Sequence, residues 1–574
     1  HWAKVIAKLW NLNGQYKLLN SEFDLNFELN GLGGRKYIVK VMRESCGLAF
    51  LDAQVDILGF LKKEEAKLPI PSVVSSIFGN RYETALDPNK KERIVWVLEK
   101  MDGMLLSEVS PKPKNLMVDL GKKIATLDLA CKKFSLDTAP PKHKWDLTKP
   151  LWIKDNLSEI RDPNLQDIVT NIMEDFISIS DKLNKMPNYW IHNDLNDQNL
   201  LVKISADGES FLSGILDFGD MTQSPTICNV AICSAYILIL SEDGLNMQLE
   251  FLRGYHSVNV LLEEELDILY TLIMTRLAVS LVNSLIMSKG KPDDPYVTIS
   301  QKGSKKFLHK MSRGKDFFTA RVRSVCKFSP VKGGDEVANY LNSSKSEFHP
   351  IIHQNLTKSR VISLDPEHSA IPENPNCITR AEAMNLTHQT GFGKTNLICL
   401  GKYLEPRLIY TTDGFRVGRG KNGDRRTIHL GIDVFIPAGT DIFSPLDGRV
   451  VHSEFCDKLL DYGGFVVVEH ATPNGKLFYA LFGHLDKHSI PSQIGVSISK
   501  GDLIGRIGNT DVNGGWEPHL HFQLALGLGH ESNWPGVCDP DEIEFWAQYC
   551  PNPARLIGIN PKAIEFEGIN KNDL

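Results

Sequence analysis

The sequence has no strong excess of either charge and no paired cysteine motif. Its 64 basic and 70 acidic residues give a formal net charge of −6 and a pI of about 6.3. We therefore expect neither nucleic acid nor a membrane surface as a partner. The ten cysteines are scattered without a CxxC pair, which predicts reduced thiols and excludes a disulfide framework.

A secretory leader and a clear membrane span are also lacking. The chain begins His-Trp-Ala-Lys, without Met and without an apolar core ending in small residues, so whether residues precede it stays open. Two apolar stretches, 227–240 and 269–287, are interpreted as buried helices. The first is shorter than the roughly 20 residues that a span needs, and the second contains Arg276 and Asn283. We expect a soluble protein.

The first half of the chain changes character near residue 104. Before it, strand-like runs at 36–42 and 93–98 flank one helix-like run at 48–62. Residues 104–312 are predicted to be mostly helical, with a strand-rich island at 190–221. At 574 residues the whole chain is too long for one hydrophobic core.

The second half begins with weak periodicity. Residues 342–376 are rich in Ser, Asn, Pro and His, which is typical of a linker or a loosely packed connector. After residue 401, short apolar runs alternate with Gly, Pro and Asp, and this pattern predicts a β domain with many turns. The runs lie at 440–443, 448–453, 465–470 and 477–482.

Two acidic motifs follow predicted strands of the first half. His-Asn-Asp-Leu-Asn-Asp-Gln-Asn spans 192–199, and Gly-Ile-Leu-Asp-Phe-Gly-Asp-Met spans 214–221. Phosphoryl transfer needs a carboxylate that orients or deprotonates the attacking hydroxyl, and an amide oxygen and a second carboxylate that hold Mg²⁺. Asp194 fits the first role, and Asn199 and Asp217 fit the metal roles. An Asx-rich turn explains either motif alone but not both in this order.

These motifs, with the helix at 121–128, resemble the aminoglycoside phosphotransferase family across about residues 15–312, and within it the hydroxylysine kinases. The resemblance implies an α+β protein-kinase-like fold with a small mixed N-lobe and a helical C-lobe. It implies Mg²⁺ with ATP or GTP, and a small cationic amino alcohol as acceptor, 5-hydroxylysine being the first candidate. It also puts a phosphate-covering turn at 21–27.

The resemblance assigns further residues of the first half. Lys40 becomes the lysine that holds the nucleotide phosphates. Gln54 stands where the family usually has a glutamate partner for that lysine, which is a departure from its pattern. His192 joins Asp194 among the expected catalytic residues. Asp220 is either a contact for the ammonium group of the acceptor or a structural turn acid, and both interpretations stay open.

Four histidines and an aspartate gather within about ninety residues of the second half: His429, Asp433, His484, His519 and His521. Residues two apart on a strand face the same side, so His519 and His521 are expected to point into one site. Two histidine nitrogens and one carboxylate would leave an open fourth position on Zn²⁺, which is the arrangement of catalytic sites.

This pattern resembles the lysostaphin/LytM-type zinc endopeptidases over about residues 405–530. The resemblance implies a mainly β domain in which His429, Asp433 and His521 bind the metal, while His484 and His519 orient water or stabilise the oxyanion. Whether this domain cleaves a peptide substrate stays open. The family mostly acts outside the cytoplasm, whereas a kinase needs cytosolic nucleotide, and we expect the whole protein to be cytoplasmic.

Together these patterns predict five segments: a kinase-like N-lobe with hinge at 1–103, a helical C-lobe at 104–312, a connector at 313–400, a zinc-peptidase-like β domain at 401–535 and a C-terminal extension at 536–574. The same order resembles the front of larger fusions that continue with a class-III aminotransferase-like module, so coupling to a pyridoxal-phosphate enzyme is expected. The leading hypothesis is an active amino-alcohol kinase with a zinc domain. A zinc metallopeptidase with a regulatory or degenerate kinase fold, and a non-catalytic ligand-binding fusion, stay open.

Overall fold

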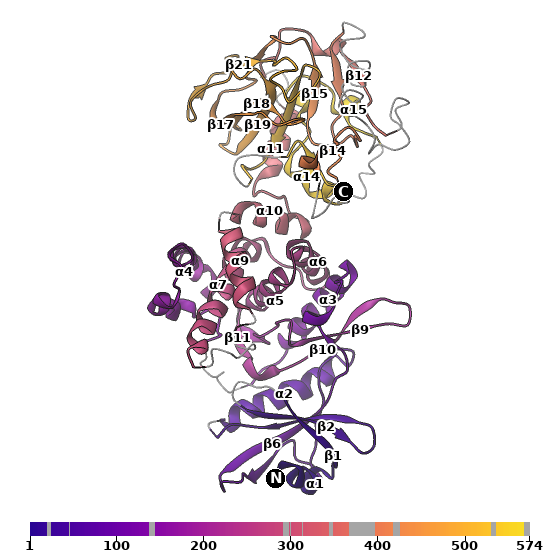
Figure 1. The fold of residues 1–574 in the computed structure, drawn as a ribbon, viewed down its shortest axis with the longest axis vertical. Coiled ribbons are helices and arrows are strands. Elements are labelled where there is room, and N and C mark those ends of the chain that lie inside the picture. Colours follow the sequence, from indigo (N-terminus) through magenta and orange to yellow (C-terminus); the bar gives the residue numbers. More distant parts are fainter. Residues whose placement is uncertain are drawn as a thin grey trace. The chain divides into compact units, whose positions relative to one another are not determined.

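The computed structural model describes residues 1–19, 24–44, 46–136, 144–290, 298, 300–312, 314–343, 348–366, 397–416, 425–529 and 535–567. The chain forms two compact units, His1–Lys315 and Asp316–Leu574 (Figure 1).

The first unit begins with a six-stranded antiparallel sheet in the order β1-β2-β3-β6-β4, with β5 also paired to β6. Val39 and Val41 of β3 pack in one cluster with helix α1 (Trp2–Trp10). Lys40 lies between them on the strand and therefore faces the other side of the sheet. Figure 1 shows helix α2 (Leu48–Glu64) on the side of the sheet opposite to α1. The strands are β1 (Gly14–Leu19), β2 (Leu25–Gly31), β3 (Lys36–Val41), β4 (Val73–Val74), β5 (Glu83–Leu86) and β6 (Glu92–Glu99).

The rest of the first unit is mainly helical, with two small sheets that carry the acidic motifs. The helices are α3 (Lys114–Cys131), α4 (Pro163–Asn184), α5 (Thr226–Leu240), α6 (Gly244–His256), α7 (Glu263–Ser288) and α9 (Gln301–Met311). One sheet has the order β10-β9-β7 and the other pairs β11 with β8. Their strands are β7 (Met104–Leu105), β8 (Tyr189–Ile191), β9 (Leu200–Ile204), β10 (Ser210–Ile215) and β11 (Thr222–Ser224).

The two long apolar stretches are core helices of this unit. Among the described residues, α7 alone is long and apolar enough to cross a membrane by length and composition, and 94% of its most apolar 18-residue window is buried. Nearly every residue of α5 is buried as well. The interpretation of 227–240 and 269–287 as buried helices is confirmed.

The second unit is built on an eight-stranded sheet in the order β12-β13-β15-β22-β19-β18-β17-β20. Only the β12–β13 pair is parallel. The strands are β12 (Arg360–Ile362), β13 (Cys399–Gly401), β15 (Ile432–Phe435), β17 (Gly448–Cys456), β18 (Gly463–Ala471), β19 (Leu477–Leu485), β20 (Ser497–Ile498) and β22 (His519–Ala525). Beside them, β14 (Ile428–His429) pairs with β23 (Val537–Cys538), and β16 (Asp441–Phe443) pairs with β21 (Leu503–Arg506).

The connector expected at 313–400 contains helices α10 (Lys315–Val325) and α11 (Gly334–Ser343) and strand β12 among its described residues. Within it, the stretch 342–376 was expected from its composition to be a linker or loosely packed, but its described part is packed into the core. Val337, Ile351 and Leu356 are buried in the same core as the large sheet, because a few apolar residues among many polar ones suffice to anchor the segment. Residues 367–396 of the expected connector lie outside the described residues.

The C-terminal segment also belongs to the core of the second unit. It supplies β23 and the helices α14 (Ile543–Tyr549) and α15 (Pro561–Ile564). Phe545, Trp546 and Tyr549 are buried in the large hydrophobic cluster of that unit. The boundaries expected at 103, 312, 400 and 535 stay predictions.

Candidate active sites

The loop after β8 brings two of the predicted phosphotransfer residues into contact. Asn199 Nδ2 donates to Asp194 Oδ2 at 2.7 Å and to the Asp194 backbone oxygen at 2.9 Å. Asn196 Nδ2 donates to the same carboxylate oxygen at 2.9 Å. These bonds use only the amide nitrogen of Asn199, which leaves its oxygen for a cation.

The loop after β10 brings Asp217 to Lys40. Lys40 Nζ lies 3.0 Å from Asp217 Oδ1. The positive charge of Lys40 is the main reason that the pKa of Asp217 is lowered. Burial alone would lower the pKa of Lys40, but Asp217 raises it overall. Both groups are therefore ionised, as phosphate and metal binding require. Asp217 has a left-handed backbone with φ 55°, which is uncommon for a residue other than glycine.

His192 forms hydrogen bonds with both of these loops. Its Nε2 donates to the backbone oxygen of Leu216 at 2.8 Å, and its Nδ1 accepts from the backbone N–H of Asp194 at 3.3 Å. Burial is the main reason that the pKa of His192 is lowered, so the ring is neutral. The structure thus shows His192 joining the loop after β8 to the loop after β10, and its expected catalytic role stays a prediction.

Gln54 is a buried residue of helix α2, and Asp220 lies near the Lys40–Asp217 pair. Gln54 is 3% exposed and its Nε2 has no hydrogen-bond partner among the described residues, while Lys40 pairs with Asp217. Asp220 acts electrostatically on both Lys40 and Arg276, so it lies near the lysine expected to hold the phosphates and near Arg276. Residues 21–23 of the expected phosphate-covering turn lie outside the described residues.

Sequence reasoning missed the buried partner of Asp194. Arg276 of α7 is 1% exposed, and its Nη2 donates to Asp194 Oδ1 at 2.9 Å. The guanidinium also lies over the rings of Trp145 and Tyr236, at 4.8 and 5.4 Å from their centroids. A single arginine in an apolar helix is a signal for such a pair, because arginine is rarely buried without a partner for its charge.

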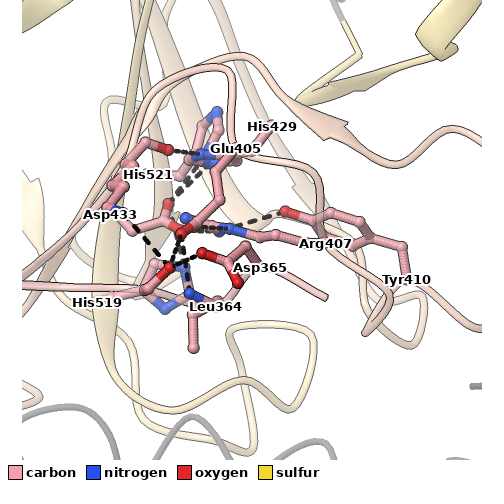
Figure 2. Close-up of polar contacts among 11 residues, drawn as sticks. Leu364, Asp365, Glu405, Arg407, Tyr410, His429, Asp433, His519 and His521 are labelled. Carbon is pink, nitrogen blue, oxygen red and sulfur yellow. Dashed lines mark hydrogen bonds and ion pairs between the residues drawn. The ribbon is translucent and has the colours of Figure 1, made fainter. Parts of the chain in front are cut away.

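The three predicted zinc ligands meet in the second unit. One ligand atom from each of His429, Asp433 and His521 lies within 4.8 Å of the others. Asp433 and His521 are directly opposite on β15 and β22. His429 Nε2 and His521 Nδ1 each lie 3.2 Å from Asp433 Oδ1 and 3.0 Å from one another. Figure 2 shows these side chains converging on one point.

The outer nitrogens of both histidine ligands are fixed by hydrogen bonds. His429 Nδ1 donates to the backbone oxygen of Lys402 at 3.0 Å, and His521 Nε2 donates to Gln523 Oε1 at 2.9 Å. Metal-binding histidines usually donate their other N–H in this way, so His429 Nε2 and His521 Nδ1 are left for the ion. Two nitrogens and one carboxylate oxygen fit Zn²⁺. A Cβ at Gly431 would lie 2.7 Å from His521 Cε1, so the motif needs glycine there.

His484 and His519 stand beside the ligands as a pair of neutral rings. Their centroids are 4.2 Å apart. Each Nδ1 donates to a backbone oxygen, that of Asn513 at 3.0 Å and that of Glu517 at 2.6 Å. Burial is the main reason that the pKa of each histidine is lowered. The Nε2 atoms are therefore unprotonated and able to accept a proton.

A cavity of about 630 Å³ opens over this cluster. Its size is that of a site for a small molecule or a short peptide segment. The wall contains both the predicted ligands and several aromatic rings, Tyr410, Phe415, Tyr462 and Trp516.

Comparison with known proteins gives one family for each unit. Residues 15–267 match the phosphotransferase enzyme family, and residues 427–533 match peptidase family M23. The chain therefore carries a phosphotransferase domain of the aminoglycoside type followed by an M23 peptidase domain. Both resemblances and the expected fold class are confirmed. Kinases of this kind use Mg²⁺ with a nucleotide, and M23 peptidases are zinc metalloproteases.

Individual relatives cover the two domains separately. Hydroxylysine kinase of Danio rerio is 27% identical over 324 residues, 54% of this chain and 91% of that protein. An uncharacterized metalloprotease of Buchnera aphidicola subsp. Baizongia pistaciae (strain Bp) is 33% identical over 98 residues, 17% of this chain and 23% of that protein. A solved microcompartment-associated aminopropanol kinase is 17% identical with a TM-score of 0.45, over 54% of this chain and 96% of its own.

Proposed function

We propose that the first unit transfers a phosphoryl group from ATP or GTP to the hydroxyl of a small cationic amino alcohol, with 5-hydroxylysine as the first candidate. One observation carries this proposal: His192 joins the loop holding the Asp194–Asn199 contact to the loop holding the Lys40–Asp217 ion pair. The name of the relatives that match in sequence, hydroxylysine kinase, supports the choice of acceptor.

Each residue of the site has its own role in the proposed phosphoryl transfer. Asp194 accepts a hydrogen bond from the acceptor hydroxyl and takes its proton as the phosphoryl group moves. Lys40 holds the nucleotide phosphates once they replace Asp217 as its partner. Asn199 and Asp217 would hold Mg²⁺, which when bound neutralises the charge of the phosphates. Asp220 supplies a negative charge for the ammonium group of the acceptor.

The kinase proposal is tested by nucleotide turnover with Mg²⁺ across a panel of acceptors. The panel contains 5-hydroxylysine, ethanolamine, choline, homoserine and an aminoglycoside, each with ATP and with GTP. We expect one acceptor to stimulate turnover selectively, and Asp194→Asn to abolish that stimulation. A folded protein that binds nucleotide but turns over with none of these acceptors would favour a kinase fold used for binding alone.

We propose a second activity, zinc-dependent peptide hydrolysis, for the second unit. Its support is the complete ligand set with both outer histidine nitrogens fixed. His429, Asp433 and His521 would hold the zinc ion, which when bound polarises a carbonyl and activates water. The neutral rings of His484 and His519 would orient the attacking water or stabilise the oxyanion, and one of the two would accept the proton of the water and return it to the leaving amine.

His519→Ala tests this second activity. We expect the variant to keep bound zinc but to lose cleavage of any peptide that the wild-type chain cleaves. Cleavage at the wild-type rate by a zinc-loaded His519→Ala chain would contradict the assigned role.

Two further proposals concern the setting of the enzyme. A cytoplasmic location follows from the need for nucleoside triphosphate, and cell fractionation tests it. Coupling to a pyridoxal-phosphate enzyme would let a phosphorylated amino alcohol lose its phosphate by elimination. Consumption of the kinase product by such an enzyme tests the coupling, and a product that is inert to it would contradict the coupling.

A further inference from the structure

A buried chain of alternating charges ends at the predicted zinc ligand Asp433. Arg407 Nε donates to Glu405 Oε2 at 2.7 Å, and Arg407 Nη1 donates to Asp433 Oδ2 at 2.5 Å. The side chains of Glu405, Arg407 and Asp433 are 0%, 2% and 4% exposed. Figure 2 shows Arg407 between the two carboxylates, with its Nη1 also donating to the Tyr410 hydroxyl at 3.3 Å.

The two oxygens of Asp433 therefore have different partners. Oδ1 faces the ligand nitrogens of His429 and His521, whereas Oδ2 accepts from Arg407. A carboxylate can bind a metal ion through one oxygen or through both. For Oδ2 to reach the ion as well, it would have to leave Arg407, and a buried charge that loses its partner is strongly unfavourable.

The residues that hold Arg407 in place lie outside the region that matches the peptidase family. Glu405 Oε1 accepts from the backbone N–H of Leu364 at 2.8 Å and from Ser363 Oγ at 3.2 Å. These residues and Arg407 all precede residue 427, where the family match begins. The residues that hold Arg407, and through it the predicted ligand Asp433, thus lie in the connector and in the segment after β13.

We propose that Arg407 is a positioning residue that keeps Asp433 a one-oxygen zinc ligand and so keeps a coordination position open for water and substrate. Two histidine nitrogens and a single carboxylate oxygen occupy three positions of a tetrahedral ion. A second oxygen from Asp433 would compete for the fourth. The inference rests on the proposed function only in requiring that the site binds zinc, and it is independent of whether peptides are cleaved.

The test uses the full-length chain loaded with Co²⁺, whose visible absorption weakens as its coordination number increases. In Arg407→Met we expect one bound Co²⁺ per chain with weaker visible absorption than in the wild type, because Asp433 Oδ2 is released to the ion. Arg407→Lys keeps a cation beside Oδ2 and is expected to restore the wild-type spectrum. Arg426→Met is the matched control, since Arg426 lines the same cavity but donates to the Gly414 backbone oxygen at 2.6 Å.

A wild-type spectrum in metal-loaded Arg407→Met would overturn the proposal, and so would an equal change in Arg426→Met. Should Arg407→Met fail to fold, a crystal structure of the zinc-loaded wild-type chain decides: one Asp433 oxygen bonded to zinc supports the proposal, and two oxygens overturn it. A wild-type chain that binds neither Co²⁺ nor zinc would instead remove the zinc half of the proposed function, and this inference with it.

Discussion

Arg276 Nη2, in helix α7, donates to Asp194 Oδ1 at 2.9 Å. The residue proposed to orient the acceptor hydroxyl therefore has a buried positive charge as its partner. Arg276 is 1% exposed, whereas Asp194 is 21% exposed. Removing one member of such a pair leaves the other charge without compensation. Asp194 therefore stabilises the helical lobe in addition to its proposed role in catalysis.

Asp194→Asn is expected to lower the free energy of unfolding of the first unit by about 2 kcal/mol. This is less than for a fully buried pair, because water reaches Asp194. Hydrogen exchange of the α7 amides measures the change separately from the second unit. The double variant Asp194→Asn/Arg276→Met is expected to recover most of this stability and none of the activity, since it removes both charges. Wild-type exchange in Asp194→Asn would contradict the proposed pairing energy.

Lys40→Met is expected to reduce phosphoryl transfer by about 100-fold or more, as does the loss of one donor to developing charge in other enzymes. Its effect on stability is expected to stay below about 1 kcal/mol, because the Lys40–Asp217 pair is partly exposed, at 14% and 52%. Lys36→Met is the matched control, an exposed lysine of the same strand. Equal losses of turnover in the two variants would refute the assignment of Lys40.

Asp128 of α3 is a buried acid that is connected through Asn229 to the loop after β8 and that makes stability depend on pH. Tyr255 Oη and Asn229 Nδ2 donate to its two oxygens at 2.7 and 2.6 Å. Asn229 Oδ1 in turn accepts from the backbone N–H of Asn193 at 3.1 Å. Burial raises the pKa of Asp128 to about 7, so the folded protein holds this proton more tightly than the unfolded chain does.

The stabilising contribution of protonated Asp128 is therefore complete below about pH 4, near the unfolded pKa, and is lost as the pH rises to about 7. Asp128→Asn removes this titration. Between pH 4 and pH 8 we expect the stability of wild type relative to Asp128→Asn to fall by up to about 4 kcal/mol. Hydrogen exchange of the α3 amides across this range measures it, and parallel pH profiles for the two proteins would contradict it.

Gln523→Met is expected to weaken zinc binding by about 10- to 100-fold, because Gln523 Oε1 fixes the ring of His521 with Nδ1 toward the ion. Competition with a chelator of known affinity measures the change. His470→Gln is the control, since His470 is equally buried but bonds to the Asp447 backbone oxygen at 2.9 Å. An unchanged zinc affinity in Gln523→Met would show that the ring is held by other contacts.

Local patterns in the sequence were sufficient to predict most helices and strands near the sites. Helix α2 spans 48–64 where 48–62 was predicted, and β19 spans 477–485 where 477–482 was predicted. Apolar periodicity, and Gly or Pro at the ends of helices and strands, are patterns of only a few residues. They can therefore be recognised in a single sequence. The pairs Asp194 with Asn199 and His519 with His521 could be predicted for the same reason, because the two members of each pair are close together in the sequence. Gln523 could have been found too, because it is two residues after His521 on the same strand face.

The partners of the buried arginines could not be predicted in this way. Arg276 lies 82 residues from Asp194, and Arg407 lies 26 residues from Asp433. A buried arginine shows that an anion must be near, but tertiary packing decides which one. The connector was misjudged for a related reason: its polar composition concealed the few apolar residues, such as Ile351 and Ile352, that bury it in the core.

Phosphorus-31 NMR of the acceptor tests most directly whether the first unit phosphorylates an amino alcohol through Asp194. The full-length chain is incubated with Mg²⁺, ATP or GTP, and 5-hydroxylysine, and the other amino alcohols serve as parallel acceptors. We predict a new phosphate monoester on one acceptor with the wild-type chain and none with the folded Asp194→Asn/Arg276→Met variant. Equal monoester formation by that variant, or nucleotide hydrolysis without any phosphorylated acceptor, would contradict the proposed function.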